Sequence, residues 1–136
     1  MGISREFYMV KDFHKAFGHP VSESPKLMQP ERAYKRYKWM KEEIDEFITA
    51  TEDGDIYEQV DAMIDTIYFA LGTLVEIGVN PEPIFNIVQK ANMSKLWDDG
   101  KPRYNEDGKV IKPKGWIDPH ESIKSEIDRQ GGRNEN

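Results

Sequence analysis

Residues 41–65, KEEIDEFITATEDGDIYEQVDAMID, contain two acidic segments of helical pattern on either side of a short acidic loop, residues 52–55. In both segments apolar residues recur every three or four positions, the spacing of one face of an α-helix. A connection this short makes consecutive helices antiparallel neighbours. The stretch therefore predicts a helical pair, with one helix from Pro30 to about residue 51 and another from about Ile56 to Ile77.

Carboxylates follow the apolar stripe of each predicted helix when residues are placed at about 100° intervals. The stripes consist of Tyr37, Met40, Ile44, Phe47 and Ile48 on the first helix and of Val60, Ile64, Ile67, Leu71, Leu74 and Val75 on the second. The acids beside them are Glu42, Glu43 and Glu46 on the first helix and Glu58, Asp61 and Asp65 on the second. If these edges face each other, the carboxylates repel unless a cation lies among them. Oxygen ligands without His or Cys suit Mg²⁺, with Mn²⁺ as the other candidate.

Glutamates on a helix are also ordinary surface residues, and nearby lysines could pair with them at helical spacing. Asp is a poor helix former, however, and Asp61 and Asp65 interrupt a strongly apolar helix beside its core stripe. A structural helix would not need them there, so we predict Glu43, Glu46, Asp61 and Asp65 as metal ligands. Glu58 is a further candidate ligand, but its spacing from Asp55 also fits a helix-capping box.

Two further motifs complete a family resemblance. Glu42-Glu43-x-x-Glu46, the aspartate-bearing helix and Asn92-Met93-Ser94-Lys95 resemble the all-α nucleoside triphosphate (NTP) pyrophosphatases, which include MazG, dimeric dUTPases and phosphoribosyl-ATP pyrophosphohydrolase. The segment 100–113, with Gly-Lys-Pro-x-Tyr and Asp-Gly-Lys-Val-x-Lys-Pro, resembles a bacterial and phage MazG-like branch. The second helix fits the family's E-x-x-D pattern at Glu58 and Asp61. In a register four residues later, Asp65 is the aspartate and Ala62 occupies the glutamate position, with Asp61 one residue upstream as a substitute.

The resemblance implies hydrolysis of an NTP or dNTP to the monophosphate and pyrophosphate, a house-cleaning reaction of the nucleotide pool. It implies Glu42 and Glu46 as catalytic residues that orient or deprotonate the attacking water. Nucleotide contacts would come from Asn92, Lys95, Tyr68, Lys101, Tyr104 and Lys109. The alternative for Asn92 and Lys95 is a purely structural role, with Asn92 as a helix C-cap and Lys95 as a cation that complements the helix dipole. The alternative function is a non-catalytic MazG-like module that binds nucleotide or regulates a partner.

Composition narrows the remaining choices. The chain has 136 residues, no cysteine and a net charge of −6, which disfavours disulfides, thiolate metal sites and nonspecific nucleic-acid binding. Because no apolar run approaches about 20 residues, we expect no membrane span and a cytoplasmic protein. A thin core for one chain suggests a homo-oligomer, a dimer or tetramer, as the resemblance also implies.

The expected fold is all-α: a MazG-like bundle of about four main helices in a single domain over residues 1–136. The helical core covers about residues 4–95, with the first helix at 4–17 and the fourth from about Pro83 to Asn92. Residues 96–136 are rich in Gly and Pro and form an irregular tail, with a small hairpin around Asp107-Gly108 and a short helix at 120–130. The lysines of this tail could belong to an ordered loop that closes over phosphates.

Overall fold

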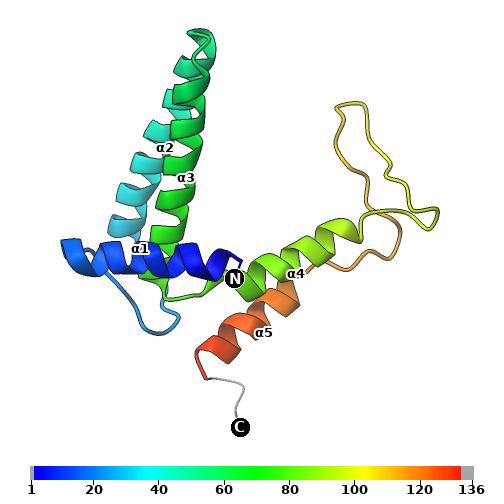
Figure 1. Cartoon of the computed structure of the whole chain (residues 1–136). Coiled ribbons are helices and arrows are strands. Elements are labelled where there is room, and N and C mark those ends of the chain that lie inside the picture. Colours follow the sequence, from blue (N-terminus) through cyan, green and yellow to red (C-terminus); the bar gives the residue numbers. More distant parts are fainter. Residues whose placement is uncertain (1, 133–136) are drawn as a thin grey trace. The chain divides into compact units, whose positions relative to one another are not determined.

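The computed structural model describes residues 2–132, which form five α-helices (Figure 1). They are α1 (Ile3–Phe17), α2 (Pro30–Glu52), α3 (Ile56–Ile77), α4 (Pro81–Met93) and α5 (His120–Gln130). The chain divides into two compact units, Met1–Pro81 and Glu82–Asn136, and each is described by itself. The prediction of one domain over the whole chain stays a prediction. The predicted all-α fold class is confirmed, since no strand occurs between residues 2 and 132.

The ends of α2 and α3 lie at residues whose chemistry favours the start or the end of a helix, and the sequence alone shows these residues. Pro30 begins α2, where its missing N–H costs nothing. The Asp55 carboxylate caps α3 by accepting a hydrogen bond from the Glu58 backbone N–H at 3.1 Å. Gly78 ends α3 at a φ of 82°, in the left-handed region that glycine tolerates. These caps explain why the predicted bounds of α2 and α3 are nearly those observed.

In the first unit, α3 packs against both α1 and α2. Figure 1 shows α2 and α3 side by side, with α1 across the end where α2 begins and α3 finishes. The core at this crossing consists of Phe7, Val10, Leu71 and Val75. The connection between α1 and α2 is tied to the same end, because the backbone N–H groups of Ser22 and Lys26 donate to the carbonyls of Val75 and Ile77 at 3.1 and 2.8 Å.

The apolar stripes of α2 and α3 form much less of this core than predicted. Leu71 and Val75 are buried, but the stripe residues nearer the α2–α3 loop are about half exposed, namely Ile44, Ile48, Val60, Ile64 and Ile67. The periodicity located the apolar face correctly, but no residue between 2 and 81 covers that part of it. A face of this kind is typical of surfaces that bind another protein chain.

A buried charged network lies where the three helices meet. The Glu76 carboxylate accepts hydrogen bonds from Arg32 Nε at 2.8 Å and from Arg36 Nη1 at 2.6 Å. His14 is buried beside them, and its Nδ1 lies 2.9 Å from the Pro20 carbonyl oxygen. Burial is the main cause that lowers the pKa of His14, so the ring is neutral at pH 7. These groups fix the crossing of α1 over α2 and α3.

The second unit contains α4 from its second residue, the segment 94–119 and α5. The predicted short helix is confirmed as α5. The predicted hairpin is reduced to one isolated antiparallel bridge between Tyr104 and Val110. The last four residues of the predicted tail, 133–136, lie outside the described part. Between residues 2 and 132 no single helix is long and apolar enough to span a membrane; α3 and α4 meet that criterion only as a bent pair.

Candidate active site

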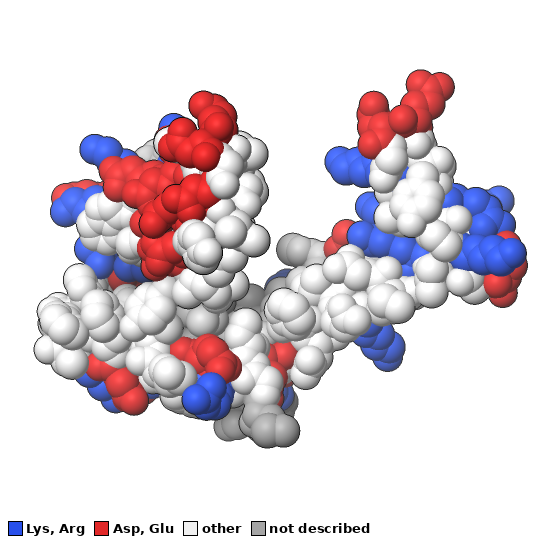
Figure 2. Space-filling model, turned by 45° about the horizontal axis from the view of Figure 1, so that its top comes forward, with Lys and Arg blue, Asp and Glu red and all other residues white. Residues whose placement is uncertain are grey.

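Eight acidic residues of α2, α3 and their loop line one hollow of about 590 Å³ in the first unit. Figure 2 shows this concentration of Asp and Glu along the helix pair. The carboxylates that line the hollow are Glu43, Asp45, Glu46, Asp53, Asp55, Glu58, Asp61 and Asp65. Thr49 and Ala50 complete the lining. The predicted meeting of the two acidic helix edges is thus present in the structure.

Glu43 lies at the centre of this charge. Burial, a hydrogen bond with Glu46 and the negative charges of Glu46, Asp65 and Asp61 together raise the pKa of Glu43 to about 7. Burial, followed by the charges of Asp61 and Glu46, also raises the pKa of Asp65. Carboxyl groups this close cannot all ionise without a large electrostatic cost. The four groups predicted as ligands therefore interact as one cluster.

The donor set fits a hard divalent cation. Glu43 Oε2 is buried and has no hydrogen-bond donor, and the side chains around it are carboxyls, which bond to it only through a shared proton. A cation is the other partner such an oxygen can take. In their present positions, no three or more Asp, Glu, His or Cys side chains of residues 2–132 are arranged as a metal site.

Some of the predicted site residues line the hollow and others do not. On α3, Glu58, Asp61 and Asp65 all reach it, whereas Ala62 is buried at 1% exposure and does not. Ala62, the glutamate position of the second motif register, is therefore a core position. Asp61 and Asp65, which precede and follow it in the sequence, both line the hollow. Glu42 is exposed and does not line the hollow.

Three acids that line the hollow were not among the predicted ligands. They are Asp45, Asp53 and Asp55. Asp45 already pairs with Lys41 at 3.2 Å, and Asp55 already caps α3. The acidic composition of the loop could have indicated that Asp53 and Asp55 lie near the hollow. Their positions in the sequence do not distinguish a metal ligand from a helix cap.

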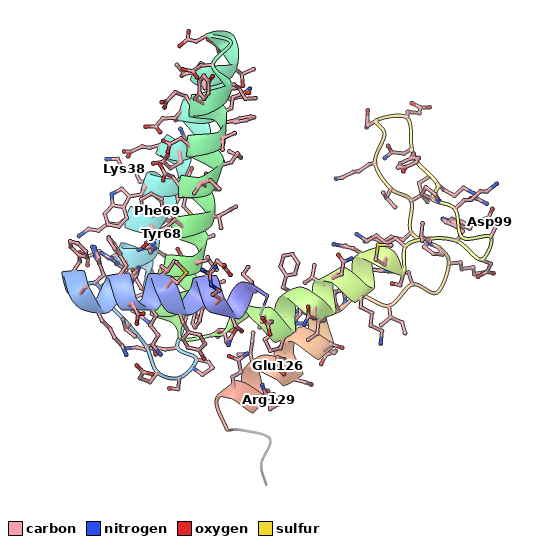
Figure 3. All side chains as sticks on the ribbon, viewed as in Figure 1. Lys38, Tyr68, Phe69, Asp99, Glu126 and Arg129 are labelled. Carbon is pink, nitrogen blue, oxygen red and sulfur yellow. The ribbon has the colours of Figure 1, made fainter. Side chains whose placement is uncertain are left out.

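The predicted nucleotide contacts fall in two separate places. In the second unit Asn92, Lys95 and Tyr104 line a pocket of about 290 Å³ at the end of α4, together with Met93, Leu96, Pro102 and Val110. Lys101 and Lys109 are exposed and do not line this pocket. Tyr68, which is labelled in Figure 3, belongs to the first unit. Its ring packs edge-on against the Phe13 ring, with 5.5 Å between the ring centres. It does not line the acidic hollow.

The fold is all-helical, and its carboxylate cluster lies on two adjacent helices, α2 and α3. The family model for phosphoribosyl-ATP pyrophosphohydrolase matches residues 10–92, which is more than half of the chain. The chain belongs to this family, and the predicted family resemblance is confirmed.

Solved structures agree with this assignment. One that resembles the chain is the crystal structure of a proposed NTP pyrophosphohydrolase from Exiguobacterium sp. 255-15, with 32% sequence identity and a TM-score of 0.53. The match covers 91% of this chain and 95% of that one. A comparison with curated proteins finds no match.

Proposed function

We propose that this protein is a metal-dependent NTP pyrophosphohydrolase that converts an NTP or dNTP to the monophosphate and pyrophosphate. The observation that carries the proposal is the cluster of Glu43, Glu46, Asp61 and Asp65, with one buried Glu43 oxygen that lacks a donor. Family membership supports hydrolysis of a phosphoric anhydride. A nucleotide-pool role follows from such an activity, and a cytoplasmic location stays a prediction.

Glu43, Glu46, Asp61 and Asp65 would hold Mg²⁺, or Mn²⁺, with Glu58 as a further ligand at the rim of the hollow. When bound, such an ion would supply positive charge that offsets phosphate charge and makes a water molecule more acidic. Water attacks the α-phosphorus, the bond to the oxygen that bridges to the β-phosphorus breaks, and pyrophosphate leaves. A carboxylate of α2 that does not hold the ion, Glu42 or Glu46, would accept the proton of that water. The acids of the loop repel free anions, so a triphosphate would enter with its charge already offset by metal.

The second unit would contribute nucleotide contacts. The pocket of Asn92, Lys95 and Tyr104 combines an amide, an ammonium and an aromatic ring with apolar walls, which is the usual composition of a small-molecule site. Tyr68, Lys101 and Lys109 stay weaker candidates, because they lie outside this pocket.

We also propose that the protein is a homo-oligomer. Ile44 and Ile48 on α2 and Val60, Ile64 and Ile67 on α3 expose about half of their side-chain surface. Burying such side chains contributes about 25 cal/mol per Å² of apolar surface, which favours association of one copy with another. A dimer or a tetramer would satisfy this face.

The test is pyrophosphate release from a panel of canonical and modified NTPs and dNTPs, with Mg²⁺, with Mn²⁺ and with EDTA. Glu43→Gln and Asp65→Asn run alongside, with Lys124→Ala on α5 as a matched surface control. We expect metal-dependent release that both acid variants lose by about 100-fold or more, because each removes a ligand. The control should keep full activity.

A non-catalytic binding module is the competing function, and it is favoured by the position where Ala62 replaces a family glutamate. Its signature is saturable nucleotide binding by folded protein with no pyrophosphate release from any nucleotide of the panel. That result would overturn the proposed hydrolysis and leave the binding pocket of the second unit to explain the function.

A further inference from the structure

Trp116 is fixed against the end of α4 in the second unit. Its indole N–H donates to the Ala91 carbonyl oxygen at 3.0 Å and to Ser94 Oγ at 2.9 Å. Ser94 Oγ in turn donates to the same carbonyl at 2.6 Å. The ring is therefore held in one orientation although it lies in a segment without regular secondary structure.

Two lysine ammonium groups lie over this one ring. Lys95 Nζ is 5.4 Å and Lys112 Nζ is 4.7 Å from the ring centre. Both distances are within the range of cation–π attraction. Neither lysine forms an ion pair with any carboxylate of residues 2–132. Figure 2 shows the basic side chains gathered over the segment that follows α4.

The same segment contains a matched counterexample. Arg103 lies 5.3 Å from the centre of the Trp97 ring, but its guanidinium is paired with Asp99 at 2.8 Å. Asp99 is labelled in Figure 3. The charge of Arg103 is therefore offset by Asp99 within the same loop. The charges of Lys95 and Lys112 over Trp116 are not offset by a carboxylate in this way.

Two like charges near one ring repel each other, and an anion that contacts both removes the repulsion. The end of the α4 dipole accounts for a cation at Lys95. It does not account for Lys112, which is 17 residues beyond Ser94-Lys95 in the chain and is brought to the ring by the loop. The convergence of the two lysines is therefore better explained by a ligand than by helix stability.

Lys95 also lines the pocket that contains Asn92 and Tyr104. An anion at the lysine pair would thus adjoin a space with apolar and aromatic walls. A phosphate chain attached to a nucleoside has both parts, an anionic chain and a flat, partly apolar group.

We propose that Lys95 and Lys112, positioned by Trp116, bind the di- or triphosphate chain of a nucleotide and that this binding requires no metal. Lys112 is then a second phosphate-binding residue and Trp116 a positioning residue. The inference rests on the proposed function only for the identity of the ligand as a nucleotide.

The test uses the full chain in EDTA, so that the carboxylates of the first unit hold no metal. Inorganic triphosphate, pyrophosphate and orthophosphate are titrated by isothermal calorimetry. We expect saturable binding of triphosphate and pyrophosphate, and weaker binding of orthophosphate, because orthophosphate carries less negative charge to offset the two ammonium groups. Lys95→Ala and Lys112→Ala should each weaken pyrophosphate binding by about tenfold, since each removes a charge-assisted hydrogen bond.

Control variants separate charge from folding. Lys112→Arg keeps the cation and should bind pyrophosphate nearly as wild type does, and Lys124→Ala on α5 should be unchanged. Trp116→Phe keeps a ring for the lysines and should lose less affinity than Trp116→Leu. Binding by Lys112→Ala as tight as by wild type, or no binding of any of the three anions by wild type, would overturn the inference. Loss of pyrophosphate release by Glu43→Gln is independent of these titrations, so each proposal can fail alone.

Discussion

Metal affinity is expected to depend on pH through Glu43. Between about pH 6 and about pH 8, Mg²⁺ binding to the cluster of Glu43, Glu46, Asp61 and Asp65 should strengthen by about tenfold. The reason is that a proton and the ion compete for the same carboxyl. The pKa of Glu43 is raised to about 7 by burial, by its hydrogen bond with Glu46 and by the charges of Glu46, Asp65 and Asp61.

The size of the effect follows from that pKa. About nine in ten Glu43 side chains carry the proton one pH unit below it and about one in ten one unit above it. A proton-competed affinity therefore changes by about a factor of ten across this window. The raised pKa of Asp65 acts in the same direction. A carboxyl of ordinary pKa is ionised throughout this range and would give almost no change.

Isothermal calorimetry at several pH values measures this dependence, and a comparison of two buffers with different ionisation heats counts the protons released. Glu43→Gln should bind Mg²⁺ weakly and with little change over the window. Glu31→Gln is the matched control, because Glu31 is an exposed glutamate of α2 that does not line the hollow. Equal affinity of the wild type at both ends of the window, with no proton release, would refute the reasoning.

Four further outcomes follow from the structure. Asp65→Asn should leave the thermal stability of the metal-free protein unchanged or higher, because it removes a repelling charge. Glu76→Gln should destabilise the fold by about 3 kcal/mol in urea unfolding, because Arg36 is then buried without its partner. Gly78→Ala should destabilise it by at least about 1 kcal/mol in the same assay, since φ is 82° and a Cβ would meet a backbone carbonyl. Ile64→Glu, on the exposed apolar face, should reduce the mass measured by light scattering to that of the monomer.

Local chemistry made most of the fold predictable. Proline and glycine mark the ends of α2 and α3, and the period of apolar residues identifies their faces. The meeting of the acidic edges of α2 and α3 was also predictable, because Asp61 and Asp65 are unfavourable in a helix and lie on the side that faces the acids of α2. Residues three, four and seven apart share a face whatever the rest of the chain does.

What was missed depends on contacts that sequence spacing does not encode. Arg36 and Glu76 look like surface residues in the sequence, and only the crossing of α1 over the pair buries them together. Part of the predicted core stripe of α2 and α3 is half exposed, because apolar periodicity shows which face of a helix is apolar but not which residues cover that face. The convergence of Lys95 and Lys112 on Trp116 depends on the path of a loop with no period at all.

The most direct test of the carboxylate site is a crystal structure of the protein grown with Mn²⁺, with anomalous differences that locate the ion. We predict a peak in the hollow between α2 and α3, coordinated by oxygens of Glu43, Glu46, Asp61 and Asp65 at about 2.0–2.4 Å. Mn²⁺ bound elsewhere, or no bound ion in crystals grown at pH 8, would contradict the account.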